Sequence, residues 1–282
     1  MQQTEQSPTL PRVPEETAPP RGSTLYYALR FSPPEARPWL HQLHRLGREV
    51  QEIPGMVSEP GIARLKLQWW EEELERLFAG TPRHPLTRAL LPAVEQWSLP
   101  REEFQGLVMA TRDELDRGGY PDFPLQLENA LQGSGSLARL LARTLGCREP
   151  ATLAAAGRLG AVDQLGRQLR DAMPRARAGR LPLPAETLQA AGANAEDLVH
   201  GRPTPALRLA LGRQAGRIRS LHTGTLESLA PESRSALTHL RVLTALRLAL
   251  VDTLEQDEFR DLGCRVSLTP LRKLWIAWRS AR

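Results

Sequence analysis

Cysteine is nearly absent from this sequence. Only two occur in 282 residues, Cys147 and Cys264, far apart and in no spacing typical of a metal site. A disulfide-stapled fold is therefore excluded, and both thiols are expected to be reduced and packed. Aromatic residues make up only 5% of the chain, and no apolar run approaches the length of a membrane span. These absences favour a globular protein of a reducing compartment, with the cytoplasm as the expected location.

Lysine is also scarce, so almost all the positive charge comes from arginine. Lysine and arginine together number 37 against 32 acidic residues, and the pI is near 9.8. This balance permits an anionic partner such as a phosphate, an acidic lipid or a nucleic acid. The arginines are interleaved with acidic residues along helical patterns, and no zinc-finger spacing or nucleic-acid recognition motif is present. We therefore expect no nucleic-acid partner.

The first 22 residues lack any apolar segment. They combine five prolines with polar residues, which predicts a disordered Pro-rich tail over 1–22 and not a signal peptide. From residue 23 to 282 apolar residues recur at helical spacing, broken only by short Pro/Gly clusters. No strand pattern or linker interrupts this part. The sequence therefore predicts one all-α domain over 23–282.

The helical pattern is clearest in two segments. A helix over 38–53 would align Leu40, Leu43, Leu46, Val50 and Ile53 on one face. A helix over 61–79 would align Ile62, Leu65, Trp69, Trp70, Leu74, Leu77 and Phe78, and this stripe is expected to lie in the core. Further helices are expected over 85–97, 101–117, 124–146, 151–173, 187–199, 203–228 and 231–258.

A basic and apolar segment occupies 268–282. It sets Leu268, Leu271, Leu274, Trp275 and Trp278 against Arg272, Lys273, Arg279 and Arg282. Two interpretations are open, because such a helix can pack onto its own domain or make peripheral contact with a membrane or partner.

Three ordered stretches resemble the squalene/phytoene synthase family over nearly all of 23–282. The stretch "YYALRFSPPEARPWLHQLHRLGREVQEI" is similar to the family's opening helices. The stretch "RLKLQWWEEELERLFAGTPRHPLTRALLPAV" is similar to its Trp-Trp helix and following turn, and "LGAVDQLGRQLRDAMPRARAGRLPLP" to its second metal-binding helix. The resemblance implies an isoprenoid-synthase-type helical bundle around a central cavity.

The first metal-binding motif departs from the family pattern. Diphosphate-leaving chemistry on a helical fold needs carboxylates on two facing helices, because several Mg²⁺ ions must bridge the protein to the diphosphate oxygens. The resemblance would place aspartates at 51, 52 and 55, where this chain has Gln51, Glu52 and Gly55. Pro54 is also expected to end the helix early. One carboxylate survives.

The second motif departs in the same way. The resemblance would place an asparagine at 167 and aspartates at 171 and 175, where this chain has Arg167, Asp171 and Arg175. No metal site is therefore expected. If Mg²⁺ binds at all, Glu52 and Asp171 are the remaining ligands.

Acidic and basic residues alternate along the second motif helix. Asp163, Arg167, Asp171 and Arg175 follow one another at steps of four, so each neighbouring pair can bond along one helix face. Three interpretations are open: a solvated charged face without function, an arginine-lined pocket, or a Mg²⁺ site completed by carboxylates elsewhere. The candidate ligand-binding residues are Arg48, Arg167, Arg170, Arg175, Tyr26 and Tyr27.

Two further features give weaker signals. His41 and His44 share a helix but have no third metal ligand at a suitable spacing, so they are expected to be surface or packed residues. The Gly-Ser-Gly-Ser stretch at 133–136 lacks the context of a phosphate-binding loop, so it is interpreted as a helix kink that lets neighbours approach closely.

Outside the two motifs, the chain resembles a degenerate branch of the family. The stretches "VSEPGIARLKLQWWEEELERLF" and "HPLTRALLPAV" are most similar to the branch that includes the mitochondrial complex I assembly factor with a phytoene-synthase-like domain. This implies a non-catalytic factor, cytoplasmic or peripheral at the inner membrane, that assists a respiratory complex by binding a subunit, an isoprenoid or an anionic lipid. No cofactor is then expected. The alternative is a divergent Mg²⁺-dependent prenyltransferase that condenses isoprenyl diphosphates.

Overall fold

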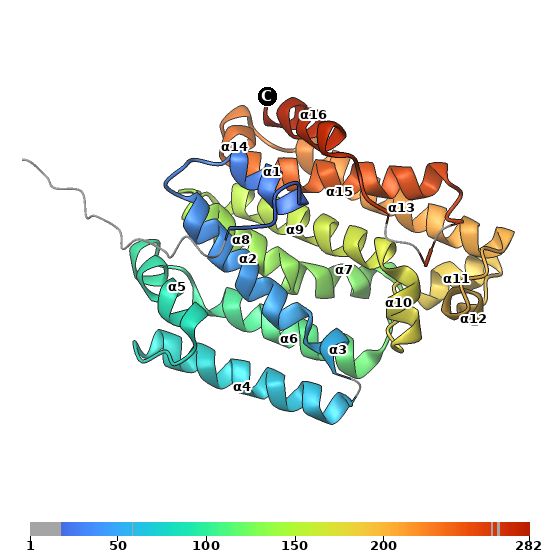
Figure 1. Cartoon of the computed structure of the whole chain (residues 1–282), viewed down its shortest axis with the longest axis horizontal. Helices are drawn as coiled ribbons and strands as arrows, with labels where there is room; N and C mark the ends of the chain where they lie inside the picture. The colour runs from blue at the N-terminus through green and yellow to red at the C-terminus, as the bar shows by residue number, and fades with distance from the viewer. Residues whose placement is uncertain (1–17, 58, 261, 264–265) are drawn as a thin grey trace, which may run out of the picture.

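The computed structural model describes residues 18–57, 59–260, 262–263 and 266–282. Residues 1–17 of the expected tail and Cys264 lie outside this part of the chain. Within it, all regular secondary structure is helical (Figure 1). The helices are α1 (Thr24–Arg30), α2 (Arg37–Gln51), α3 (Ile53–Met56), α4 (Pro60–Phe78), α5 (Pro85–Gln96), α6 (Arg101–Arg117), α7 (Phe123–Gln132), α8 (Ser134–Thr144), α9 (Pro150–Arg170), α10 (Ala172–Arg177), α11 (Ala185–Ala191), α12 (Ala195–Val199), α13 (Pro205–Glu227), α14 (Pro231–Ala236), α15 (Thr238–Gln256) and α16 (Pro270–Ala281).

Helix α9 lies at the centre of the bundle. It packs against α7 and α8 on one side and α13 and α15 on the other (Figure 1). Glycine permits the close approach of α8 and α9, since a Cβ at Gly160 would lie 2.2 Å from the Ser134 backbone oxygen. Gly133 separates α7 from α8. The interpretation of 133–136 as a kink that lets helices approach is therefore confirmed.

The boundaries of several expected helices differ from the prediction. Four expected helices are each broken in two, at Gly133, at Asp171, over 192–194 and at Leu237. The backbone leaves helical geometry there, most clearly at Gly192 with φ of +64°. These breaks are hard to predict because apolar periodicity continues across them.

The expected apolar face of α2 is confirmed. Leu40, Leu43, Leu46, Val50 and Ile53 are all buried. The helix ends at Gln51, before Pro54, as proline's missing N–H predicts. Cys147 is buried as a free thiol, and burial raises the pKa of that thiol.

The predicted core face of α4 is partly wrong. Ile62, Leu65 and Trp69 are 43%, 67% and 41% exposed. The buried face instead carries Ala63, Leu67, Trp70, Glu73, Leu74 and Leu77. The buried face thus keeps Trp70, Leu74 and Leu77 of the expected stripe but is shifted toward Ala63, Leu67 and Glu73, because α5 and α6 pack on the other edge of its broad apolar face.

Residues 18–22 form part of the described chain. The Ser23 N–H donates to the Pro20 carbonyl at 3.0 Å, and Lys273 Nζ donates to the Gly22 carbonyl at 2.9 Å. Residues 18–22, which precede the expected start of the domain at 23, thus contact the domain. Among the described helices none combines the length and the hydropathy that crossing a membrane requires.

Candidate functional site

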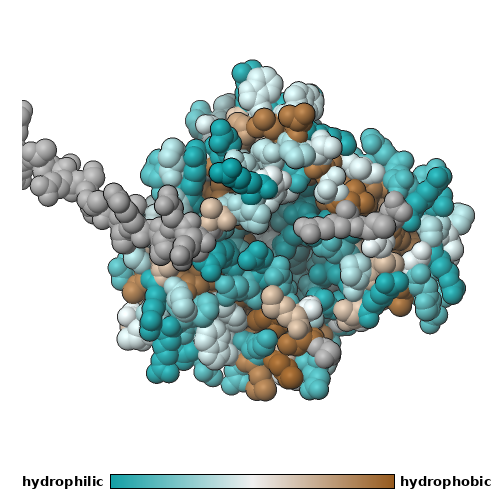
Figure 2. Space-filling view, viewed as in Figure 1, coloured by the Kyte–Doolittle hydropathy of each residue, from teal (hydrophilic) through white to brown (hydrophobic). Residues whose placement is uncertain are grey.

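A pocket of about 680 Å³ lies between the two helices that carry the altered motifs, α2 and α9. Residues 18–25, α15 and the start of α16 complete its walls. Figure 2 shows the hollow at the centre of one face of the molecule. Its apolar lining consists of Leu25, Leu137, Leu243, Leu246, Leu250, Val266 and Leu268. The expected central cavity is thus present in the bundle.

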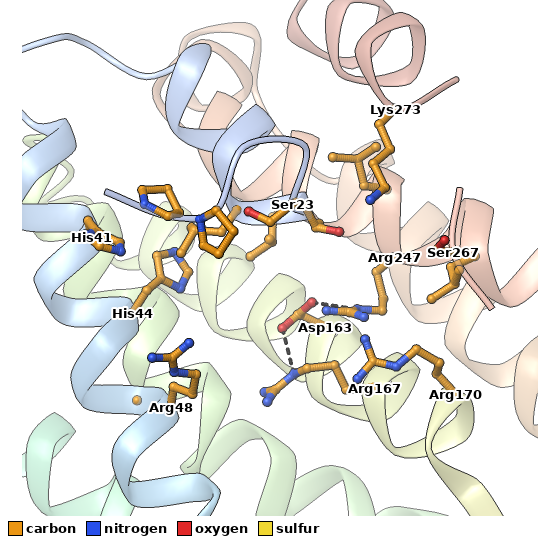
Figure 3. Close-up of a pocket in the computed structure, with 18 of the residues that line it drawn as sticks. Ser23, His41, His44, Arg48, Asp163, Arg167, Arg170, Arg247, Ser267 and Lys273 are labelled. Carbon is orange, nitrogen blue, oxygen red and sulfur yellow. Dashed lines mark hydrogen bonds and ion pairs between the residues drawn. The ribbon is translucent and has the colours of Figure 1, made fainter. Parts of the chain in front are cut away.

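The charged lining of the pocket is predominantly basic. Two carboxylates reach it, Glu52 from the residue between α2 and α3 and Asp163 from α9. The basic residues that line it are Arg45 and Arg48 of α2, Arg167 and Arg170 of α9, Arg247 of α15 and Lys273 of α16 (Figure 3). This charge distribution favours an anionic ligand over a divalent cation.

Asp163 is held between two arginines. Arg167 Nε donates to its Oδ2 at 3.0 Å, and Arg247 Nε donates to its Oδ1 at 2.9 Å (Figure 3). Burial raises the pKa of Asp163, but the two guanidinium groups outweigh burial and hold the pKa at about 2. Asp163 is therefore ionised at neutral pH and serves as the counter-ion of both arginines.

Two motif positions contact each other directly. Arg167 Nη2 donates to Gln51 Oε1 at 2.9 Å and to Ser134 Oγ at 2.8 Å. Gln51 Nε2 donates to the same Ser134 hydroxyl at 2.9 Å. Where the family pattern predicts an aspartate and an asparagine facing metal ions, this chain therefore joins α2 to α9 by side-chain hydrogen bonds.

The predicted acid-base ladder along 163–175 is wrong beyond its first step. Asp171 follows the last residue of α9, and α10 starts at Ala172. This change of direction breaks the four-residue register, so Asp171 pairs with Arg170 and not with Arg167 or Arg175. Arg175 pairs with Glu114.

The other ligand-binding candidates divide into two groups. Arg48 lines the pocket and has no hydrogen-bond or ion-pair partner among the described residues. Arg175 instead lines a separate space of about 40 Å³. Tyr27 is buried against Val242 and Leu246, and Tyr26 packs against the same cluster. Neither tyrosine lines the pocket. Residues 23–25 line it, and the following turn of α1 directs Tyr26 and Tyr27 to another side of the helix.

The remnant motif positions are not grouped. Glu52 lies at the pocket wall, whereas Gly55 and Asp171 are not part of the lining. Within the described ranges, no three His, Cys, Asp or Glu side chains gather as a metal site requires. Mg²⁺ is bound by several oxygen ligands, and Asp163 is already occupied by two arginines. The residues present do not fit a Mg²⁺ cluster.

His41 and His44 line the pocket, so the expectation that they are only surface or packed residues is incomplete, and His239 contacts His44. His44 Nε2 lies 2.8 Å from His239 Nε2, and His239 Nδ1 lies 2.9 Å from Ser32 Oγ. Burial lowers the pKa of His239 to about 4, and burial followed by the charge of His239 lowers that of His44 well below 6.5. Burial and two nearby arginines also lower the pKa of His41 to about 4. All three are neutral at pH 7, so the positive charge of the pocket comes from guanidinium and ammonium groups.

Arg247 is the main site residue that sequence reasoning missed. Its side chain is only 8% exposed, and it reaches Asp163 from α15. One signal was present, because Arg247 falls at helical spacing from Leu243 and Leu250 on an otherwise apolar face. A charged residue in such a stripe indicates a buried ionic partner.

Comparison with known proteins identifies related sequences. A model described as squalene/phytoene synthase matches residues 18–272. Phytoene synthase of Thermus thermophilus is 29% identical over 256 residues, covering 87% of this chain and 83% of that protein. Phytoene synthase 3, chloroplastic, of Zea mays is 26% identical over 258 residues, covering 89% of this chain. The chain spans only 60% of the length of that maize protein.

Solved structures share the fold. A dehydrosqualene synthase in complex with ligand aligns with a TM-score of 0.78 at 18% identity, covering 91% of this chain and 90% of that one. Squalene synthase HpnC from Alicyclobacillus acidocaldarius aligns with a TM-score of 0.72 at 22% identity, covering 83% and 88%. The predicted all-α isoprenoid-synthase-type fold is confirmed.

Proposed function

This chain belongs to the squalene/phytoene synthase family, and from that premise we propose that it binds a phosphate-headed isoprenoid directly through arginine side chains. In this proposal binding needs no divalent metal, and the protein does not condense two isoprenyl diphosphates. The pocket would then act as a carrier or sensor site.

The hydrogen bond between Gln51 and Arg167 carries this proposal. In a metal-dependent site, the side chains at these two positions would coordinate ions that lie between α2 and α9. Here the two side chains are 2.9 Å apart and bonded to each other and to Ser134. Arginine also repels a divalent cation, whereas its planar fork binds phosphate oxygens in a bidentate manner.

The rest of the pocket supports an amphipathic ligand. Arg48 has no partner in the described part of the chain. Arg170 donates from Nε and Nη2 to Asp171, which leaves its Nη1 for a phosphate oxygen. The leucines of α15 offer an apolar wall for a hydrocarbon chain. A volume of about 680 Å³ is within the usual range of roughly 300–1,000 Å³ for small-molecule sites.

Calorimetry with farnesyl diphosphate tests metal-independent binding. We expect the same affinity with Mg²⁺ and with EDTA, because guanidinium groups replace the ions as the partners of the phosphates. Substituting Arg48→Ala together with Arg170→Ala should weaken binding by at least about 100-fold, since the two substitutions remove two charged hydrogen bonds of about 1.5–3 kcal/mol each. The measurement should use low salt, where such attraction is strongest.

The matched control is Arg260→Ala. Arg260 is an exposed arginine outside the pocket, paired with Glu258, so its loss should leave the affinity unchanged. Binding that requires Mg²⁺, or an absence of binding by the wild-type protein at low salt, would contradict the proposal.

Mg²⁺-dependent condensation is the second candidate function, and the names of the relatives favour it. We expect instead that the purified protein forms no squalene or phytoene from isoprenyl diphosphates and Mg²⁺, because Glu52 and Asp163 are the only carboxylates among the described lining residues. Product analysis by chromatography checks this. Turnover that disappears in Glu52→Gln or Asp171→Asn would establish the second candidate.

A role in assembling a respiratory complex stays a prediction from the sequence resemblance. Under it, the ligand-loaded protein would contact a complex subunit. Co-purification of the full chain with such a subunit, repeated with the Arg48→Ala and Arg170→Ala variant, would test this role. A subunit that binds only to the ligand-competent protein supports it, and failure of both forms to retain any subunit argues against it.

A further inference from the structure

Helix α16 presents an apolar stripe away from the domain. Leu271, Leu274, Trp275 and Trp278 are 80%, 42%, 55% and 44% exposed. Their spacing of three, four and seven residues places them on one face of the helix. The opposite face carries the buried Ala277, which packs on α1 and α15. Of the two interpretations of 268–282, packing onto the domain accounts for Leu268 and Ala277 but not for this stripe.

The charge around the stripe is positive. No acidic residue occurs between positions 268 and 282. The Arg279 guanidinium lies 5.4 Å from the centroid of Trp275, and that of Arg282 lies 3.8 Å from the centroid of Trp278. Each exposed indole is therefore paired with an exposed cation.

A second apolar patch lies across the pocket from α16. It consists of Met56 of α3 and Ile62 and Leu65 of α4, which are 61%, 43% and 67% exposed. Figure 2 shows apolar surface above the central hollow, over α16, and below it, over α3 and the first turns of α4. The pocket therefore opens between two apolar edges on the same face of the molecule.

We propose that this face docks on the surface of an anionic lipid bilayer. The docking face is defined by Met56, Ile62, Leu65, Leu271, Leu274, Trp275 and Trp278. Docked in this way, the pocket would open toward the lipid, so an isoprenoid could pass between bilayer and pocket without crossing water. This second consequence rests on the proposed function, whereas docking itself does not.

Charge and side-chain chemistry favour a bilayer over a protein partner. Tryptophan is suited to the membrane interface, because its ring is apolar and its N–H is polar. Arginines beside the tryptophans match anionic headgroups, as in helices that lie in the interface plane. A bilayer can also cover two apolar edges that are separated by an open pocket.

Vesicle sedimentation tests the docking. The full chain is mixed with vesicles of phosphatidylcholine alone or of phosphatidylcholine with phosphatidylglycerol, at low and at high salt. We expect binding to the anionic vesicles that weakens with salt. Substituting Trp275→Ser together with Trp278→Ser should lower the partition coefficient at least about tenfold, because the burial of each apolar indole in the bilayer favours binding. Arg279→Glu with Arg282→Glu should abolish the preference for anionic vesicles.

The control is Leu209→Ser, which removes a 49% exposed leucine of α13 outside the docking face and should leave sedimentation unchanged. Wild-type protein that binds neither vesicle type at low salt, or tryptophan variants that bind like the wild type, would overturn the proposal. Capture of a protein partner without vesicle binding would overturn it as well. Calorimetry with farnesyl diphosphate separates the two proposals. The tryptophan variant should keep its affinity for farnesyl diphosphate. The Arg48→Ala and Arg170→Ala variant should lose that affinity and still bind vesicles.

Discussion

Replacing Asp163 by asparagine is expected to lower the free energy of unfolding by about 3–5 kcal/mol, the usual cost of removing one partner from a buried ion pair. Asp163 is the counter-ion of Arg167 and Arg247. Arg247 is only 8% exposed, so without the carboxylate its charge would remain buried and uncompensated. For a chain of this size the melting temperature should fall by about 10 °C. Thermal and urea unfolding of both proteins measure the difference.

Asp171→Asn provides the matched control for this variant. Asp171 belongs to the same motif, but its side chain is 41% exposed and pairs with its neighbour Arg170. Exposed pairs of this kind contribute at most about 1 kcal/mol, so the control should unfold almost like the wild type. Equal losses in the two variants would show that Asp163 is not the central counter-ion. A double variant with Arg247→Met should recover part of the stability, because the unpaired charge is then gone.

Replacing Glu73 by glutamine is expected to destabilise the protein by about 3 kcal/mol. Glu73 is fully buried on α4. It accepts hydrogen bonds from the backbone N–H groups of Arg83 and His84, both at 2.8 Å, and from the side chains of Arg76 and Thr87. These hydrogen bonds hold the turn at Arg83 and His84, which precedes α5, against α4. An amide cannot satisfy four donors as a carboxylate does.

The same carboxylate predicts a pH dependence. Burial raises the pKa of Glu73, but the hydrogen bonds from Thr87, His84, Arg76 and Arg83 outweigh burial and lower it from 4.5 to about 2. Because the folded-state pKa is below the unfolded value, this stabilisation is complete above pH 4.5 and is lost as the pH falls toward 2. The glutamine variant should therefore lose less stability than the wild type between these pH values. The control is Glu72→Gln, whose side chain is 56% exposed and 3.8 Å from Arg76.

Parallel pH profiles for the wild type and the glutamine variant would contradict this assignment. So would an equal loss of stability in the Glu72→Gln protein at neutral pH. Either result would mean that the buried bonds of Glu73 contribute no more than a surface pair.

The helix α2 was predictable because its information is local. Its apolar residues recur at a single period, and Pro54 gives an unambiguous stop. On α4 the apolar residues cover more than half of the circumference, so periodicity could not decide which edge faces the core. The packing of α5 and α6 decided it, and Leu65 and Trp69 were left on the surface.

The candidate site was predictable only in part. The sequence placed Arg48, Arg167 and Arg170 near the altered motifs, and all three line the pocket. Arg175 was predicted to bind the ligand on the assumption that one continuous helix runs from 151 to 173 and beyond. The helix is broken at Asp171, and Arg175 therefore does not line the pocket. Helix breaks of this kind depend on neighbouring helices and are not visible in the apolar pattern.

The sequence by itself determined the helical class, the family resemblance and the replacement of the motifs' aspartate and asparagine residues by Gln51, Arg167 and Arg175, since each is a matter of residue type and local spacing. Only the tertiary structure decided which groups those residues contact. Arg167 meets Gln51 across 116 positions of sequence, and Arg247 meets Asp163 across 84. The physical reason is that an arginine takes whichever acceptor the packed helices bring within about 3 Å, and helix packing depends on the shape of the whole core.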